Sequence, residues 1–157
     1  MVQHMQQGNF EVCIQEAEGF LETAQWCSRD KVFMSEQMRY PFVVNISFAC
    51  ELYIKAIMIY ESKNNSFIVG HNLLELFTNM SPIAQAAIRD AYERKAGDSL
   101  PSESLEQFLG MCKNDFKDWR YAFQKGGLTA NASNYLHFVF GLKDYVEEIK
   151  KTILLEV

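Results

Sequence analysis

Residues 40–60 read YPFVVNISFACELYIKAIMIY, and this stretch decides the fold. Almost every side chain in it is apolar, so a helix made from it is apolar on nearly all sides and belongs in the core. Glu51 and Lys55 alone carry charge, and they lie four positions apart with the acid N-terminal to the base. On a helix this order places the two side chains next to each other. The central helix therefore keeps one acid and one base on a single face.

Two interpretations of this charged pair remain open at the level of sequence. At about 3.6 residues per turn, Ser47, Glu51 and Lys55 share one narrow stripe of the helix. The pair is either an ion pair at the edge of a helical bundle, worth about 0.3–0.5 kcal/mol, or the wall of a polar pocket. The pocket interpretation is included because burying an acid and a base in an apolar helix costs free energy unless both have partners.

Length and composition indicate one soluble domain over residues 1–157. The chain has 48% hydrophobic and 22% charged residues, with no linker-like or repeated tract, which argues against disorder. A chain of this length buries well over half of its unfolded surface in a single core. The formal net charge of −5 gives no footprint for nucleic acid over the whole surface, so a polyanion requires a local basic patch.

The cysteines and the N-terminus indicate a cytoplasmic protein. Four scattered cysteines without a Cys-x-x-Cys pair fall within apolar helical patterns, as expected of buried free thiols in a reducing compartment. Residues 1–7 lack the features of a signal peptide, and the polar residues within 42–60 disfavour a membrane span. No cluster has the spacing of metal ligands and no glycine-rich phosphate loop is present, so we expect neither a metal nor a cofactor.

Apolar residues recur at helical spacing in six segments, and no stretch alternates for long enough to predict a strand. The sequence therefore predicts an all-α bundle of four long helices with two short helices inserted between the second and the third. The expected helices cover about 9–29, 41–62, 72–80, 83–95, 103–124 and 131–155.

Helix-start signals support these boundaries. Asn72, with Glu75 three positions later, has the spacing of a capping box, and Ser81-Pro82 supplies a cap followed by a proline in the first turn. His71 directly precedes the first of these starts, where an imidazole either helps to cap the helix or contacts an anion. Gly126-Gly127 ends the run that begins at 103.

A second candidate for function lies near the end of that run. Lys113, Lys117 and Arg120 form a short basic stripe beside Trp119 and Tyr121. One interpretation is a binding site, because such a combination can hold a phosphate and stack a base. The second interpretation is that these are solvated charges around a tryptophan of the core. We prefer the second interpretation for the two lysines. Arg120 is flanked by bulky aromatic residues, and we expect its guanidinium to reach Glu51.

Three segments together resemble the HEPN superfamily of prokaryotic helical domains. They are NISFACELYIKA at 45–56, GHNLLELF at 70–77 and FKDWRY at 116–121, so the resemblance spans roughly 40–121. It implies a bundle of four or five helices, commonly a homodimer with a functional groove at the subunit interface. Members are often components of toxin–antitoxin or phage-defence systems, and many cut RNA without a metal.

The chain departs from the catalytic members of that superfamily at one point. Those members carry an arginine followed a few residues later by a histidine, whereas Lys125, Gly126 and Gly127 occupy the corresponding places after Arg120. No other arginine has a histidine at that spacing. Without that histidine there is no evident general base for attack by a 2′-hydroxyl, so the catalytic residues are unknown.

Three hypotheses follow from the sequence. The first is a noncatalytic HEPN-like module that binds RNA or a nucleotide, or that acts as a subunit beside a cognate antitoxin or a nucleotidyltransferase. The second is a metal-independent ribonuclease toxin that uses Glu51, His71 and Arg120. The third is a structural dimerisation domain. The candidate binding cluster consists of Glu51, Lys55, His71, Trp119, Arg120 and Tyr121.

Overall fold

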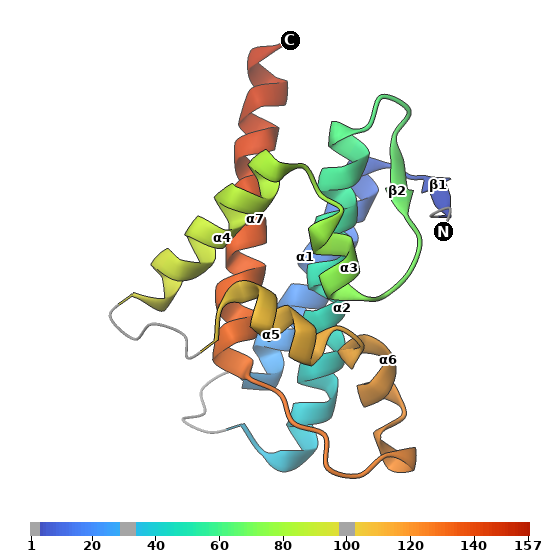
Figure 1. Cartoon of the computed structure of the whole chain (residues 1–157), viewed down its shortest axis with the longest axis vertical. Helices are drawn as coiled ribbons and strands as arrows, with labels where there is room; N and C mark the ends of the chain where they lie inside the picture. Colours follow the sequence, from blue (N-terminus) through green and yellow to red (C-terminus); the bar gives the residue numbers. More distant parts are fainter. Residues whose placement is uncertain (1–3, 29–33, 98–102) are drawn as a thin grey trace.

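The computed structural model of the chain describes residues 4–28, 34–97 and 103–157, and this part is predominantly helical, as predicted (Figure 1). In chain order its elements are β1 (Met5–Gln7), α1 (Phe10–Ser28), α2 (Glu36–Glu61), β2 (Ser66–Ile68), α3 (Leu73–Thr78), α4 (Pro82–Ala96), α5 (Leu105–Cys112), α6 (Asp115–Arg120), the 3-10 helix η1 (Ala122–Gln124) and α7 (Ala132–Leu155).

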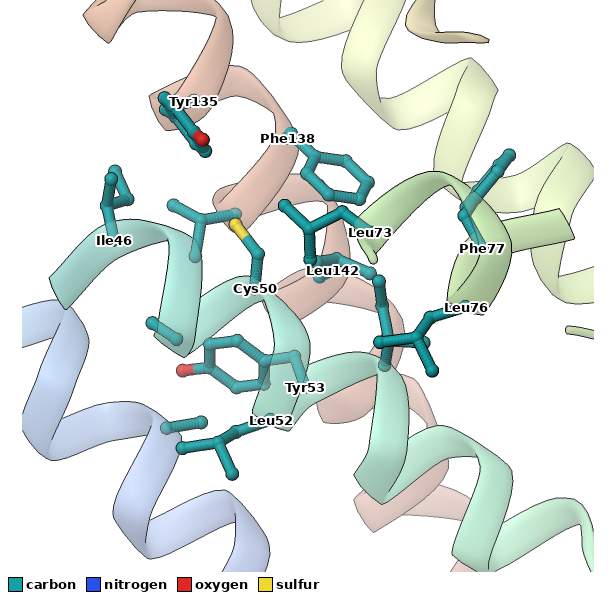
Figure 2. Packing of buried hydrophobic residues seen from close by; sticks show 14 of the residues in the cluster. Ile46, Cys50, Leu52, Tyr53, Leu73, Leu76, Phe77, Tyr135, Phe138 and Leu142 are labelled. Atoms are coloured by element: carbon teal, nitrogen blue, oxygen red, sulfur yellow. The ribbon is translucent and has the colours of Figure 1, made fainter. Parts of the chain in front are cut away.

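Helix α2 is the central element, as its apolar sequence requires. It packs against α1 along much of its length, and it also contacts α7, α6 and α3. Ile46, Ile54 and Ile57 are fully buried, and each large apolar side chain removed from water in this way contributes about 1.5–3 kcal/mol. Figure 2 shows the side chains of α2 meeting those of α3 and α7 in one continuous core.

Among the described helices, α2 alone is long and apolar enough to span a membrane. Within the structure, 78% of that apolar stretch is buried against the other helices. A membrane span would instead direct such side chains to lipid, so this burial is that of a core helix in a soluble protein.

The local capping signals confirm several of the predicted boundaries. The Asn72 side chain accepts a hydrogen bond from the Glu75 amide at the start of α3, and Ser81 does the same for Ala84 at the start of α4. Helix α5 begins with a complete capping box between Ser104 and Gln107. Each of these caps satisfies backbone N–H groups that the first turn leaves without helical partners.

The run at 103–124, predicted as one long helix, is broken into α5, α6 and η1. The Lys113 carbonyl accepts a hydrogen bond from the Leu73 amide at 3.1 Å and is therefore drawn toward the start of α3. Two residues later, the buried Asp115 side chain accepts a hydrogen bond from Tyr135 of α7 at 2.6 Å. These two contacts with distant segments turn the chain at Asn114, although the apolar spacing continues across the break.

Two further features differ from the sequence prediction. Helix α2 begins at Glu36, so Pro41 lies inside the helix rather than in its first turn. A two-stranded antiparallel sheet pairs β1 with β2, with Met5 opposite Ile68 and Gln7 opposite Ser66. Strands of three residues are too short for an alternating pattern to reveal them. This sheet ties the N-terminal segment to the connection between α2 and α3.

Candidate functional site

The charged pair of α2 is buried and has a third member. The Glu51 side chain is 1% exposed, and its Oε1 accepts a hydrogen bond from Lys55 Nζ at 2.7 Å. His71 Nδ1 lies 2.9 Å from Oε2 of the same carboxylate and 3.1 Å from Oε1. Because both carboxylate oxygens have partners, the buried acid is compensated.

His71 is held in this position by the turn that follows β2. Gly70 precedes it with a φ of +133°, a conformation that residues with a Cβ rarely adopt, and Asn72 follows it as the cap of α3. The imidazole side chain is 50% exposed. When Nδ1 carries a proton and donates it to Glu51, the other ring nitrogen, Nε2, is left as an acceptor for a ligand. The sequence suggested capping or anion contact for His71 and did not reveal its pairing with Glu51.

These three residues lie in a groove of about 400 Å³, which we call the His71 groove. Its lining comprises Gly8, Asn9, Val12, Cys13, Glu16, Phe48, Glu51, Leu52, Lys55, Ile59, Phe67 and His71. Apart from the acid, base and imidazole, most of this surface is apolar. Lys55 Nζ lies 5.4 Å from the centre of the Phe67 ring, which is within range of a cation–π contact. The pocket-wall interpretation of the charged pair therefore fits the geometry better than an exposed ion pair.

The Cys13 thiol also lines the His71 groove, but it is not an activated nucleophile. It donates a hydrogen bond to the Leu52 carbonyl at 3.1 Å. Burial raises its pKa to about 11, and the nearby carboxylate of Glu16 adds to this shift. A thiol that holds its proton this firmly supplies almost no thiolate near neutral pH.

Arg120 does not reach Glu51, contrary to the sequence prediction. Within the described part of the chain, its Nε donates to the Phe116 carbonyl at 3.1 Å, and its guanidinium lies 4.3 Å from the centre of the Phe116 ring. That ring lies 5.1 Å from the His71 ring and 4.5 Å from the Phe48 ring, between ring centres. Arg120 is thus exposed at the edge of the His71 groove, on the far side of Phe116. The position beside Glu51 that was predicted for Arg120 is occupied by His71.

Trp119 and Tyr121 lie outside the lining of the His71 groove. Trp119 is 5% exposed and packs against Tyr40, with 5.7 Å between ring centres, at a separate cavity of about 420 Å³. Tyr121 is 45% exposed and lies beneath the Arg120 guanidinium, 5.6 Å from ring centre to guanidinium carbon. Of the six predicted cluster residues, the structure brings Glu51, Lys55 and His71 together and leaves Arg120 one ring away.

Two aromatic side chains that shape the site were not predicted from the sequence. Phe116 separates Arg120 from His71, and Phe67 of β2 lies over Lys55. Phe116 carried a signal, since it belongs to the segment that resembles the HEPN superfamily. Phe67 carried none, because its role depends on the pairing of β2 with a distant strand. Among the described residues, no group of three His, Cys, Asp or Glu side chains is arranged to hold a metal ion.

Comparison with known proteins adds no assignment. No family model matches the chain, and neither a curated protein nor a solved structure matches it with significance.

Proposed function

We propose that the protein is a noncatalytic, HEPN-like cytoplasmic module that binds RNA or a nucleotide in the His71 groove. The proposal rests on one observation. Two polar groups that can still bind a ligand lie beside an apolar groove with aromatic walls. These groups are Nε2 of His71 and the guanidinium of Arg120, which forms no ion pair within the described residues.

The proposed binding mode divides a nucleotide between these features. A base enters the groove against Phe67 and Phe48, since base–aromatic stacking contributes about 1–3 kcal/mol for each base. The phosphate lies outside, against Arg120, whose planar guanidinium suits bidentate contact with phosphate oxygens. Phe116 already holds that guanidinium in place through its ring and its carbonyl, which limits the rotamer entropy lost on binding.

Fluorescence anisotropy with short labelled single-stranded RNA, with unlabelled mononucleotides as competitors, tests the proposal. We expect Arg120→Ala to weaken binding about tenfold, which corresponds to one charge-assisted contact. It should also reduce the dependence of log affinity on log salt by about 0.7, the contribution of one phosphate contact to a single strand. Phe67→Leu keeps an apolar side chain but removes the ring, and it should weaken binding without changing the salt dependence.

Arg94→Ala is the matched control, because Arg94 is an exposed arginine on α4 that pairs with Asp90 of the same helix. It should leave the affinity unchanged. Equal affinities of the wild type, Arg120→Ala and Phe67→Leu would refute the His71 groove as the binding site. Absence of any RNA or nucleotide binding would leave two noncatalytic hypotheses, a subunit beside a cognate antitoxin or nucleotidyltransferase and a structural dimerisation domain.

The Glu51–His71 pair favours one alternative, a metal-independent ribonuclease. A carboxylate that fixes Nδ1 of a histidine orients Nε2 as a general base toward a 2′-hydroxyl, and Arg120 would then stabilise the phosphate as charge develops. Growth arrest and RNA cleavage on expression, both abolished by His71→Ala, would establish this activity. Intact cellular RNA at high expression would exclude it.

A further inference from the structure

A second cavity, which we call the Asp115 cavity, lies at the corner between α5 and α6. It has a volume of about 210 Å³ and shares no lining residue with the His71 groove. Its walls are largely apolar and come from α5, the start of α6 and the segment that leads into α7. The lining residues are Phe108, Met111, Cys112, Asp115, Thr129, Ala130 and Asn131.

Asp115 is the one acidic side chain in this lining, and it is 7% exposed. Its Oδ2 accepts a hydrogen bond from the buried Tyr135 hydroxyl at 2.6 Å. Within the described residues, Oδ1 accepts no hydrogen bond of normal geometry, and no lysine, arginine or histidine forms an ion pair with the carboxylate. The carboxylate can therefore accept a further hydrogen bond at the wall of the cavity, because the nearby Trp119 indole forms none of normal geometry with it.

Among the described residues, no cation compensates the charge of Asp115. Burial raises its pKa from 3.8 to about 6; the Tyr135 hydroxyl and the nearby Trp119 indole oppose this shift, whereas Asp118 adds to it. The Cys112 thiol and the Tyr135 hydroxyl both keep their protons at neutral pH, since burial raises their pKa values as well. The carboxyl is thus nearly buried without a positive partner among the described residues, and an uncompensated buried carboxylate is costly to the fold.

We propose that the Asp115 cavity binds a small primary ammonium whose charged head pairs with Asp115 Oδ1 and whose short apolar chain lies against Phe108, Met111 and Ala130. A volume of 210 Å³ accommodates roughly seven water-sized groups. This size selects a chain of about five or six carbon atoms. The ammonium supplies the positive charge that no described residue places beside Asp115.

Isothermal titration calorimetry with n-pentylamine near neutral pH tests this proposal, with n-pentanol as the uncharged control of similar size. We expect saturable binding of the amine and at least tenfold weaker binding of the alcohol. Asp115→Asn keeps the shape and the acceptor for Tyr135 but removes the charge, so it should abolish the preference for the amine. Equal affinity for the amine and the alcohol, or an unchanged preference in Asp115→Asn, would overturn the proposal.

A second variant keeps the test valid if Asp115→Asn fails to fold. Met111 is 67% exposed at the mouth of the Asp115 cavity, so Met111→Lys should fold normally and bring a competing ammonium to the carboxylate. We expect it to weaken n-pentylamine binding at least fivefold. Ile83→Lys is the matched control, since Ile83 is 78% exposed on α4 and does not line the cavity. Identical amine affinities in the two lysine variants would also overturn the proposal.

Discussion

The Glu51 carboxylate can be buried in the core because neighbouring side chains compensate its charge. Its side chain is 1% exposed, and Lys55 and His71 together satisfy both carboxylate oxygens. Removing charge from one member of a buried pair leaves the other without compensation, which costs more than the pair itself contributes. The residue therefore links the stability of α2 to the geometry of the His71 groove.

We predict that Glu51→Gln lowers the free energy of unfolding by about 3 kcal/mol, because the largely buried Lys55 ammonium loses its counterion. Urea unfolding followed by circular dichroism measures this loss. The double variant Glu51→Gln/Lys55→Met should recover most of the stability, since it removes the uncompensated charge. A single variant as stable as the wild type would show that the ion pair contributes nothing to the fold.

Asp115 predicts a pH dependence of the opposite sign to that of most salt-bridged acids. Its pKa is about 6 in the folded protein and about 3.9 in an unfolded chain, so the folded state holds the proton more tightly. The stabilising contribution is fully present below about pH 4 and is lost as the pH rises through about 6. The facing Cys112 and Tyr135 groups do not titrate in this window, because burial raises their pKa values.

We therefore expect the free energy of unfolding of Asp115→Asn to rise relative to that of the wild type as the pH increases from 4 to 7, by on the order of 2 kcal/mol. Urea unfolding at several pH values measures the difference between the two proteins, in which the contributions of other titrating groups largely cancel. A difference that is constant with pH would contradict the raised pKa of Asp115.

At the scale of elements, the packing of α4 against α7 depends on Gly141. A Cβ at this position would lie 3.4 Å from the Ala91 Cβ and 3.5 Å from the Tyr92 amide nitrogen. There is no space for a longer side chain between the two helices at their contact. A Cβ alone would make ordinary van der Waals contacts at this position, so the restriction falls on side chains longer than that of alanine.

We predict that Gly141→Leu destabilises the protein by about 1–3 kcal/mol through overpacking, with a lower thermal midpoint as the measurement. Gly19 of α1 is the matched control, because a Cβ there meets nothing within 4 Å outside its own helix. Gly19→Leu should be neutral or slightly stabilising, since leucine favours a helix more than glycine does. Equal effects of the two substitutions would show that helix propensity, and not packing, governs Gly141.

Across the whole molecule, the features that were predicted correctly from the sequence are those that depend on neighbours along the chain. The buried α2, the caps at Asn72 and Ser81, and the contact between Glu51 and Lys55 follow from local spacing. The features that were not predicted depend on a distant partner. The break at Asn114 arises from contacts with α3 and α7, and the position of Arg120 depends on how that break redirects α6.

The pairing of β1 with β2 has a kinetic consequence for the His71 groove. Met5 meets Ile68 only after α1 and α2 have folded back on each other, so this wall of the groove forms by pairing two segments that lie far apart in the chain. Its strands are short, and few backbone hydrogen bonds hold them together. The amide protons of this sheet should therefore exchange with solvent ahead of those in α2 and α7, and the groove would open by local unfolding while the helical core stays intact.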